Sequence, residues 1–147
     1  MTAPTSIRGV VKTYLVATLA ATLDPIPVAH GWPGRNIERD HVWVDRVTGF
    51  LELPLLTAGR KFRDDKFTVR VAFQASAPGD DIAETVERVL ALYAHVENLL
   101  ADDPGLGEMD GLISAALGPV EGPDGSLTDE GAVSFVFADI AIHARLS

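Results

Sequence analysis

The sequence predicts an α+β fold: a mixed, mainly antiparallel sheet packed by two main helices, with a projecting β-arm or loop. Two long segments repeat apolar residues at helical spacing, and several shorter ones alternate apolar and polar residues as strands do. A charged segment also precedes the clearest strand. The 147 residues, 47% of them apolar, are enough to bury a sizeable core, so residues 1–147 are expected to form a single domain.

The first predicted helix has Thr5 or Ser6 as its N-cap and ends before Asp24, because proline follows at the next position. Its apolar residues follow helical spacing, while Arg8 and Lys12 share the other face. A basic start and a short apolar run are also typical of a signal peptide. The one-sided distribution favours the amphipathic helix, because a secretory apolar segment need not be one-sided.

Several extended segments are expected next. Residues 24–36 are rich in proline and glycine and predict a loop, with at most a short edge strand at 26–29. The segment DHVWVDRV (40–47) alternates as a strand does, and a weaker extended segment follows at 49–56. Apolar residues occupy the odd positions of 67–73, which predicts a strand with one buried face.

Six charges occupy the seven positions directly before that strand. They are the candidate contact residues Arg60, Lys61, Arg63, Asp64, Asp65 and Lys66. An unpaired charge is costly to bury, so a strand that continues backward through these positions must leave its own core. The charged segment is therefore expected on a protruding loop or β-arm spanning residues 47–66.

The second predicted helix has Asp81 as its N-cap, with Glu84 three residues later, as in a capping box. Asp102-Asp103-Pro104-Gly105 is expected to end it. Its apolar stripe is predicted to consist of Ile82, Val86, Val89, Leu90, Tyr93, Val96, Leu99 and Leu100.

The C-terminal part predicts two strands separated by an acidic loop. Residues 111–121 are expected to be a short strand, and residues 121–131 a loop with a turn at Pro123-Asp124-Gly125. Residues 132–146 alternate in a way that predicts a strand buried on both faces at first and on one face later.

The net charge of −9 is unevenly distributed. Residues 1–75 hold ten Lys and Arg against seven Asp and Glu, a net charge of +3, whereas residues 76–130 hold one Arg against thirteen acids, a net charge of −12. An acidic chain argues against tight binding to nucleic acid, which requires clustered positive charge. The separation of charge favours a surface that meets a second copy head to tail.

No motif predicts an active site, a cofactor or a metal site. The chain has no cysteine, which excludes disulfides and thiolate ligands and fits a reducing cytoplasm, and its four histidines are scattered. The acidic residues of 123–131 lack the alternating oxygens of a calcium loop. The pairs Asp64-Asp65 and Asp102-Asp103 would point to opposite faces of a strand, so neither converges on one site.

No apolar run reaches the roughly 20 residues of a membrane span. The protein is expected not to be an enzyme.

The chain resembles the tail terminator proteins of long-tailed bacteriophages, also described as tail completion or minor tail proteins. The resemblance rests on DHVWVDRVTG and on LLTAGRKFRDDKFTVRVAF, between an N-terminal helix and a long second helix with two closing strands. This order covers nearly the whole chain. The family commonly has a stretch similar to AGRKFRDDKFTV (58–69) leading into a strand. The long acidic segment 101–131 has no counterpart that the resemblance explains.

The resemblance implies a structural virion protein that forms a ring, expected to be hexameric. The ring caps the tail tube, ends its polymerisation and joins the tail to the head-proximal neck, with the genome DNA passing through its lumen without specific binding. The implied partners are further copies of the chain, the tail tube protein and a neck or stopper protein. The implied location is the virion, after assembly in the host cytoplasm.

On this interpretation the basic residues at positions 60–66 meet the acidic region 76–130 of a neighbouring copy or of the tube, and Asp64 and Asp65 set the register. An acidic lumen would suit DNA that slides. Two alternatives remain open. One is a head–tail connector or stopper of the neck, and the other is a small-molecule-binding protein or enzyme. The cavity of the latter would be lined by Trp32, Trp43, Phe73 and Tyr93.

Overall fold

The computed structural model describes residues 6–32, 40–57 and 60–146, with the backbone alone for residues 50–57, 60–63 and 146. Within these ranges the chain forms two helices and one five-stranded sheet with the strand order β1-β2-β3-β5-β4. The elements in chain order are α1 (Arg8–Leu23), β1 (Val28–His30), β2 (Asp40–Thr57), β3 (Arg60–Ala77), α2 (Ile82–Asp102), β4 (Leu112–Thr128) and β5 (Gly131–Leu146). β1 is parallel to β2, and the other neighbouring strands are antiparallel. The predicted α+β fold is confirmed.

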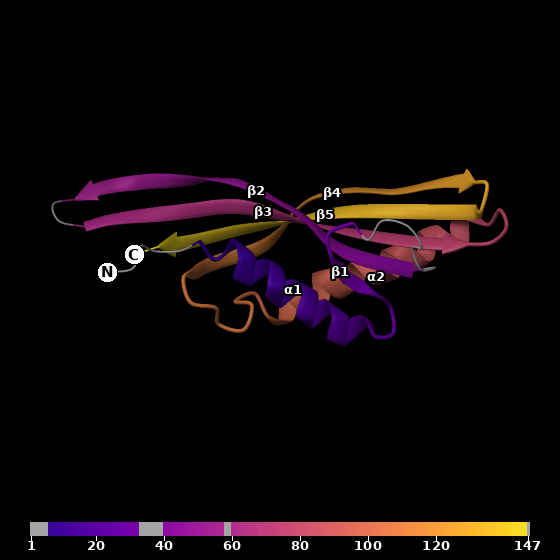
Figure 1. Ribbon diagram of the computed structural model, residues 1–147, viewed down its shortest axis with the longest axis horizontal. Coiled ribbons are helices and arrows are strands. Elements are labelled where there is room, and N and C mark those ends of the chain that lie inside the picture. Colours follow the sequence, from indigo (N-terminus) through magenta and orange to yellow (C-terminus); the bar gives the residue numbers. More distant parts are fainter. Residues whose placement is uncertain (1–5, 33–39, 58–59, 147) are drawn as a thin grey trace.

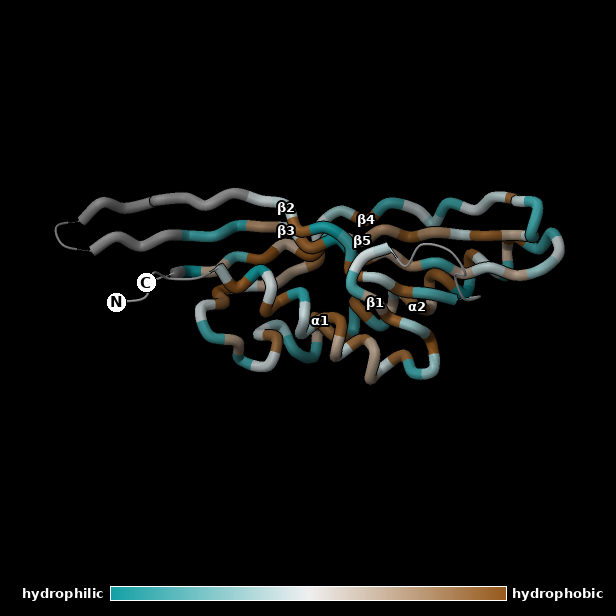
Figure 2. Tube along the Cα trace, in the orientation of Figure 1, coloured by the Kyte–Doolittle hydropathy of each residue, from teal (hydrophilic) through white to brown (hydrophobic). Residues whose placement is uncertain are grey.

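Both helices lie on one side of the sheet, and the core fills the space between the two layers (Figure 1). Alternate residues of the central strands face the helices, as the strand periodicity requires. Among the fully buried ones are Val42, Val44, Val69, Val71, Phe73, Val136, Ala138 and Ile140. Hydrophobic positions gather in this central region and along β5, whereas β4 and the β4–β5 turn are more hydrophilic (Figure 2).

The predicted first helix is confirmed as α1, which buries every fourth residue from Val11 to Leu23 against the sheet. Its N-cap is Ile7 rather than Ser6, and Thr5 lies outside the described residues. The Ser6 hydroxyl still accepts a hydrogen bond from the Arg8 backbone N–H at 3.2 Å. The short strand expected at 26–29 lies two residues later, as β1.

β2 and β3 form one long hairpin, so the two extended segments expected at 40–47 and 49–56 belong to a single strand. The pairing runs from Asp40 opposite Ala75 to Thr57 opposite Arg60. β5 accompanies this hairpin only as far as Arg63. Beyond that point the two strands pair with each other alone and project from the domain (Figure 1). We call residues 53–57 and 60–63, from the last β5-paired residue Arg63 outwards, the arm. A projecting β-arm is confirmed, but it is shorter than the predicted span 47–66, because residues 47–52 and 64–66 pair within the sheet.

The second predicted helix is confirmed as α2. The Asp81 carboxylate accepts a hydrogen bond from the Glu84 backbone N–H at 3.1 Å, as the capping residue was predicted to do, and Asp103 follows the last turn. The stripe facing the sheet is Thr85, Val89, Leu92, Val96 and Leu100. Leu90, predicted to lie in the stripe, is instead 41% exposed. Neither of the described helices is long and apolar enough to span a membrane.

The predicted loop at 121–131 is wrong, because β4 continues through it to Thr128. The turn lies at Asp129 and Glu130, where Thr128 pairs with Gly131, and not at Pro123-Asp124-Gly125. β4 is an outermost strand, and its register shifts between Glu121 and Asp124. A proline is tolerated at such an edge irregularity, where its missing N–H interrupts no ladder. The turn-forming residues were therefore part of a bulged strand.

Candidate interaction site at the β-arm

The candidate residues at positions 60–66 divide between the arm and its base. Arg60, Lys61 and Arg63 lie on the arm, in the part of β3 that extends beyond the helices (Figure 1). Asp64 and Asp65 lie at the base, between β2 and β5, and their side chains are buried. Lys66 follows them and is exposed.

Asp65 connects the base of the arm to the start of α1. Its carboxylate accepts a hydrogen bond from the Ser6 hydroxyl at 2.6 Å and from the Arg8 guanidinium at 2.7 Å. The same guanidinium lies over the Phe67 ring, 5.3 Å from its centre. Burial alone raises the pKa of Asp65, but the hydrogen bonds from Arg8 and Ser6 outweigh it and hold this pKa below its usual range.

Asp64 points to the other face of the sheet and connects the base of the arm to β5. Its two oxygens accept hydrogen bonds from Arg145 Nε at 2.7 Å and from a terminal nitrogen of Arg145 at 3.1 Å. His143 Nε2 lies 3.1 Å from Asp64 Oδ2. The bidentate contact from Arg145 is the main reason why the pKa of Asp64 falls from 3.8 to about 2.

The charged segment predicts a partner contact for Asp64 and Asp65, whereas the structure places both carboxylates in ion pairs within the chain. Their partners Arg8, His143 and Arg145 were missed from the sequence. One signal pointed to them: an acid that continues the buried face of a strand requires a cation, and basic residues begin α1 and end β5. These pairs join the base of the arm to α1 and to β5.

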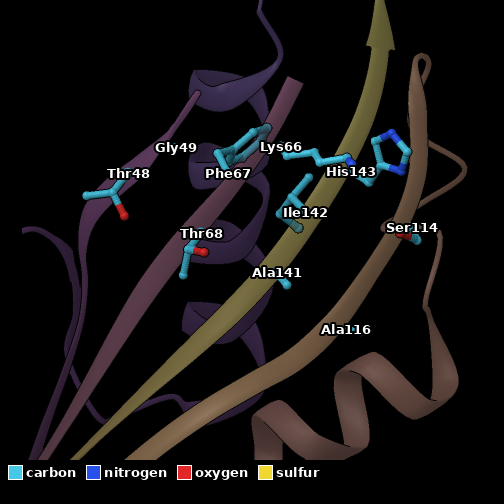
Figure 3. A pocket seen from close by; sticks show the side chains of 10 residues that line it. All are labelled: Thr48, Gly49, Lys66, Phe67, Thr68, Ser114, Ala116, Ala141, Ile142 and His143. Carbon is cyan, nitrogen blue, oxygen red and sulfur yellow. The ribbon is translucent and has the colours of Figure 1, made fainter. Parts of the chain in front are cut away.

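A shallow groove of about 420 Å³ lies beside the base of the arm, on the face of the sheet away from α1 (Figure 3). Small side chains from all four neighbouring strands form its floor, and Lys66 and His143 border it. Ser114 lies opposite His143 in the β4–β5 pairing. Catalysis by a serine needs a hydrogen bond from its hydroxyl to the base, and no such bond joins Ser114 to His143 among the described contacts. His143 also directs Nε2 at Asp64. The groove therefore offers no activated nucleophile.

The aromatic cavity of the small-molecule alternative is contradicted. Trp43 pairs with Ala72 and its neighbour Val42 pairs with Phe73, so Trp43 and Phe73 point to opposite faces of the sheet. Trp32 packs edge-on against Trp43, with 4.9 Å between the ring centres. Tyr93 packs edge-on against Phe73 in the core, with 6.1 Å between the ring centres. The four rings form two separate pairs. In the described ranges, no three His, Asp or Glu side chains are grouped as metal ligands.

One group of acidic residues lies at the end of the molecule opposite the arm. β3 runs from the arm to Ala77, which pairs with Ala132 beside the β4–β5 turn. At about 3.3 Å per residue, the 18 residues of β3 separate the two ends by on the order of 55 Å. Acidic side chains exposed near this far end are Asp80, Asp81, Glu84, Asp124, Asp129 and Glu130. Other exposed acids of the stretch, such as Asp102 and Asp110, lie at the opposite end of α2, so the charge separation along the sequence is only in part a separation in space.

No protein-family model matches the sequence. A search of the curated proteins finds no significant match.

Proposed function

We propose that the protein is a structural subunit of a bacteriophage tail, and that it assembles head to tail into a ring, with six copies as the expected number. The observation that carries the proposal is the arm, which projects with basic residues from the end opposite the acidic β4–β5 hairpin. The resemblance of the residues leading into β3 to tail terminator proteins points in the same direction.

The resemblance to tail terminator proteins favours a ring over a two-fold dimer. A two-fold dimer could pair the arm of each copy with the acidic end of the other only with the two copies antiparallel, which closes the assembly at two copies. An arm that meets the acidic end of the next copy pairs opposite charges, and the contact repeats until the rotation closes. Each subunit then uses both of its ends.

In the proposed assembly the ring caps the tail tube, ends its polymerisation and joins the tail to the neck below the head. DNA passes through the lumen without specific binding, since the chain as a whole carries a net charge of −9 and repels phosphate. The chemistry at the base of the arm supports a positioning role: Asp64 and Asp65 hold the arm's direction and make no reactive site.

The test exchanges the charge of the arm. Arg60→Glu with Lys61→Glu should give a folded monomer by circular dichroism and native mass spectrometry, because the arm would then repel the acidic end of the next copy. The matched control, Lys12→Glu with Arg46→Glu, makes the same change in charge on described residues away from the arm and should still form rings. Rings of unchanged mass from the arm variant would contradict the proposal.

A second measurement distinguishes the tail role from the neck role. The wild-type ring, added to polymerising tail tube protein, should limit the length of the tubes seen by electron microscopy, whereas the arm variant should not. A ring that leaves tube length unchanged and binds the portal-side adaptor instead would support the connector or stopper alternative.

A further inference from the structure

A strip of apolar side chains runs along α2 and β4, from the acidic end towards the middle of the sheet, where Val120 pairs with Ala138 and Ala138 with Val71. Its members are Ile82, Val86, Leu90, Val120 and Leu127, which we call the α2–β4 patch. Ile82 and Val86 are half-buried, whereas Leu90 is 41% exposed, Val120 40% and Leu127 58%, so the core does not account for the last three. Contiguous exposed aliphatic side chains mark an interaction surface.

The members of the patch come together because β4 lies directly on the start of α2. A Cβ atom added to Gly125 would lie 2.4 Å from Ile82 Cγ2 and 3.5 Å from Val86 Cγ2. Leu127 is two residues further along the same face of β4, opposite Ala132. Leu90 follows Val86 by four residues and therefore lies on the same side of the helix.

Acidic residues border part of the patch. Glu87, three residues before Leu90, is exposed beside it on α2, and Asp129 and Glu130 are exposed in the β4–β5 turn. Glu84 lies across the helix, where it pairs with Arg88. No Lys or Arg lies between residues 121 and 138 of the sequence, so the hairpin side of the patch has no basic residue. A partner that matches this surface is therefore apolar in its centre and basic around it.

The arm has the complementary composition. Its sequence, LPLLTAGRKFR over residues 53–63, contains three leucines, one phenylalanine and three basic residues, and no acid. Neither helix accompanies it beyond the end of β5 (Figure 1). A two-stranded hairpin with apolar residues is marginally stable in water unless another surface covers it. The arm projects away from the patch (Figure 1), so the arm of one copy can reach only the patch of another.

We infer that the arm of each copy docks on the α2–β4 patch of the next copy, with its leucines on Leu90, Val120 and Leu127 and its basic residues towards the acidic border. This inference rests on the proposed ring and names the surface that receives the arm. Addition of the arm as a further strand on β4 is disfavoured, because Pro119, Pro123 and three register shifts interrupt that edge. The arm therefore contacts the patch through side chains and not through backbone strand pairing.

The test uses cysteine cross-linking, because the natural chain has no cysteine to interfere. Leu55→Cys places a thiol on the arm, Leu127→Cys places one on the patch, and the two proteins are mixed and oxidised. A disulfide-linked dimer is expected from this mixture. The matched control replaces Leu127→Cys by Val10→Cys, which is 56% exposed on α1, outside the patch. That mixture should give no linked dimer.

Three results would overturn the inference. Rings that form without a disulfide from the arm and patch thiols, or equal linking in the control, would refute the docking surface and leave the proposed ring intact. Failure of the mixed proteins and of wild type to form rings at all would refute both.

A second variant tests the apolar contribution. Leu127→Gln should raise the concentration needed for half-assembly by about tenfold, because burial of a leucine on association contributes roughly 1.5 kcal/mol or more. Val10→Gln should leave that concentration unchanged. Because Leu127 is mostly exposed in the monomer, its substitution should leave the thermal midpoint of the monomer unchanged. An unchanged half-assembly concentration for Leu127→Gln would count against the patch.

Discussion

Asp64 and Asp65 are neighbours in the sequence, yet their carboxylates anchor the arm to two different elements. Asp64 contacts Arg145 at the end of β5, and Asp65 contacts Arg8 at the start of α1. Strand geometry sends neighbouring side chains to opposite faces, which was expected from the sequence. The cations on each face were not expected, because Arg8 and Arg145 are 57 and 81 residues away in the sequence from Asp65 and Asp64.

The Asp64 contact predicts a loss of stability in acid. The pKa of Asp64 is about 2 in the folded chain, against an ordinary value of 3.8 for an aspartate without these contacts. The ionised Asp64 therefore stabilises the fold above pH 4 and loses its contribution as the pH falls from about 4 to about 2. Asp64→Asn should be less stable than wild type at pH 7, and this difference should shrink across that interval.

Urea unfolding of the monomeric Arg60→Glu/Lys61→Glu protein, with and without Asp64→Asn, measures the difference free of association. Asp80→Asn, at an exposed carboxylate of the opposite end, is the control. A stability difference for Asp64→Asn that stays constant from pH 7 to pH 2 would show that the Arg145 contact does not lower the pKa.

Among the elements, helices were predicted more accurately than strands. The bounds of α2 follow from a cap and a stop signal that act within a few residues, and Asp81 does cap the helix. The first part of β4 was predicted as the strand at 111–121, but its continuation to Thr128 was not, because its pairing with β5 overrides the turn preference of Pro123 and Gly125. The cost of irregular backbone there is offset by ladder hydrogen bonds to a strand that the local sequence does not reveal.

The hairpin of β2 and β3 depends on Gly49, where the two strands approach closely. A Cβ atom at this position would lie 2.3 Å from the Lys66 carbonyl oxygen and 2.5 Å from Phe67 Cα, both backbone atoms that cannot move alone. Gly49→Ala should therefore lower the free energy of unfolding by about 1–3 kcal/mol. Gly9→Ala on α1, with nothing within 4 Å, should raise it by about 0.5 kcal/mol.

Chemical denaturation of both variants in the monomeric background measures these free energies. The opposite signs make the pair informative, since a general preference for alanine would stabilise both proteins. Unchanged stability for Gly49→Ala would mean that the strands separate at little cost at the base of the arm.

At the scale of the whole molecule, the distribution of charge decides how copies meet. The sequence divides into a basic first half and an acidic stretch from 76 to 130, and the fold carries the arm and the acidic hairpin to opposite ends. Several other acids of that stretch, such as Asp103 beside Tyr14, lie elsewhere in the fold. The acidic stretch is therefore not one surface, and the hairpin end is the part that faces away from the arm.

Ring assembly should weaken with salt if arm and hairpin attract each other by charge. Between 0.1 and 1 M NaCl the screening length falls from about 10 Å to about 3 Å, so the half-assembly concentration should rise several-fold. Lys61→Gln should reduce this dependence on salt, whereas Leu127→Gln should weaken assembly and leave the dependence unchanged. Sedimentation velocity measures all three proteins. Assembly of the wild type that does not respond to salt would contradict the role of charge.

The sequence by itself determined what depends on near neighbours: the two helices, the alternation of β3 and β5, the α+β class and the projection of a charged segment that could not be buried unpaired. Only the tertiary structure decided the pairing of Asp64 and Asp65, the extension of β4 and the exposure of Leu90, Val120 and Leu127. The physical reason is distance along the chain. Periodicity and capping act over a few residues, whereas ion pairs, strand partners and surface patches join residues that only folding brings together.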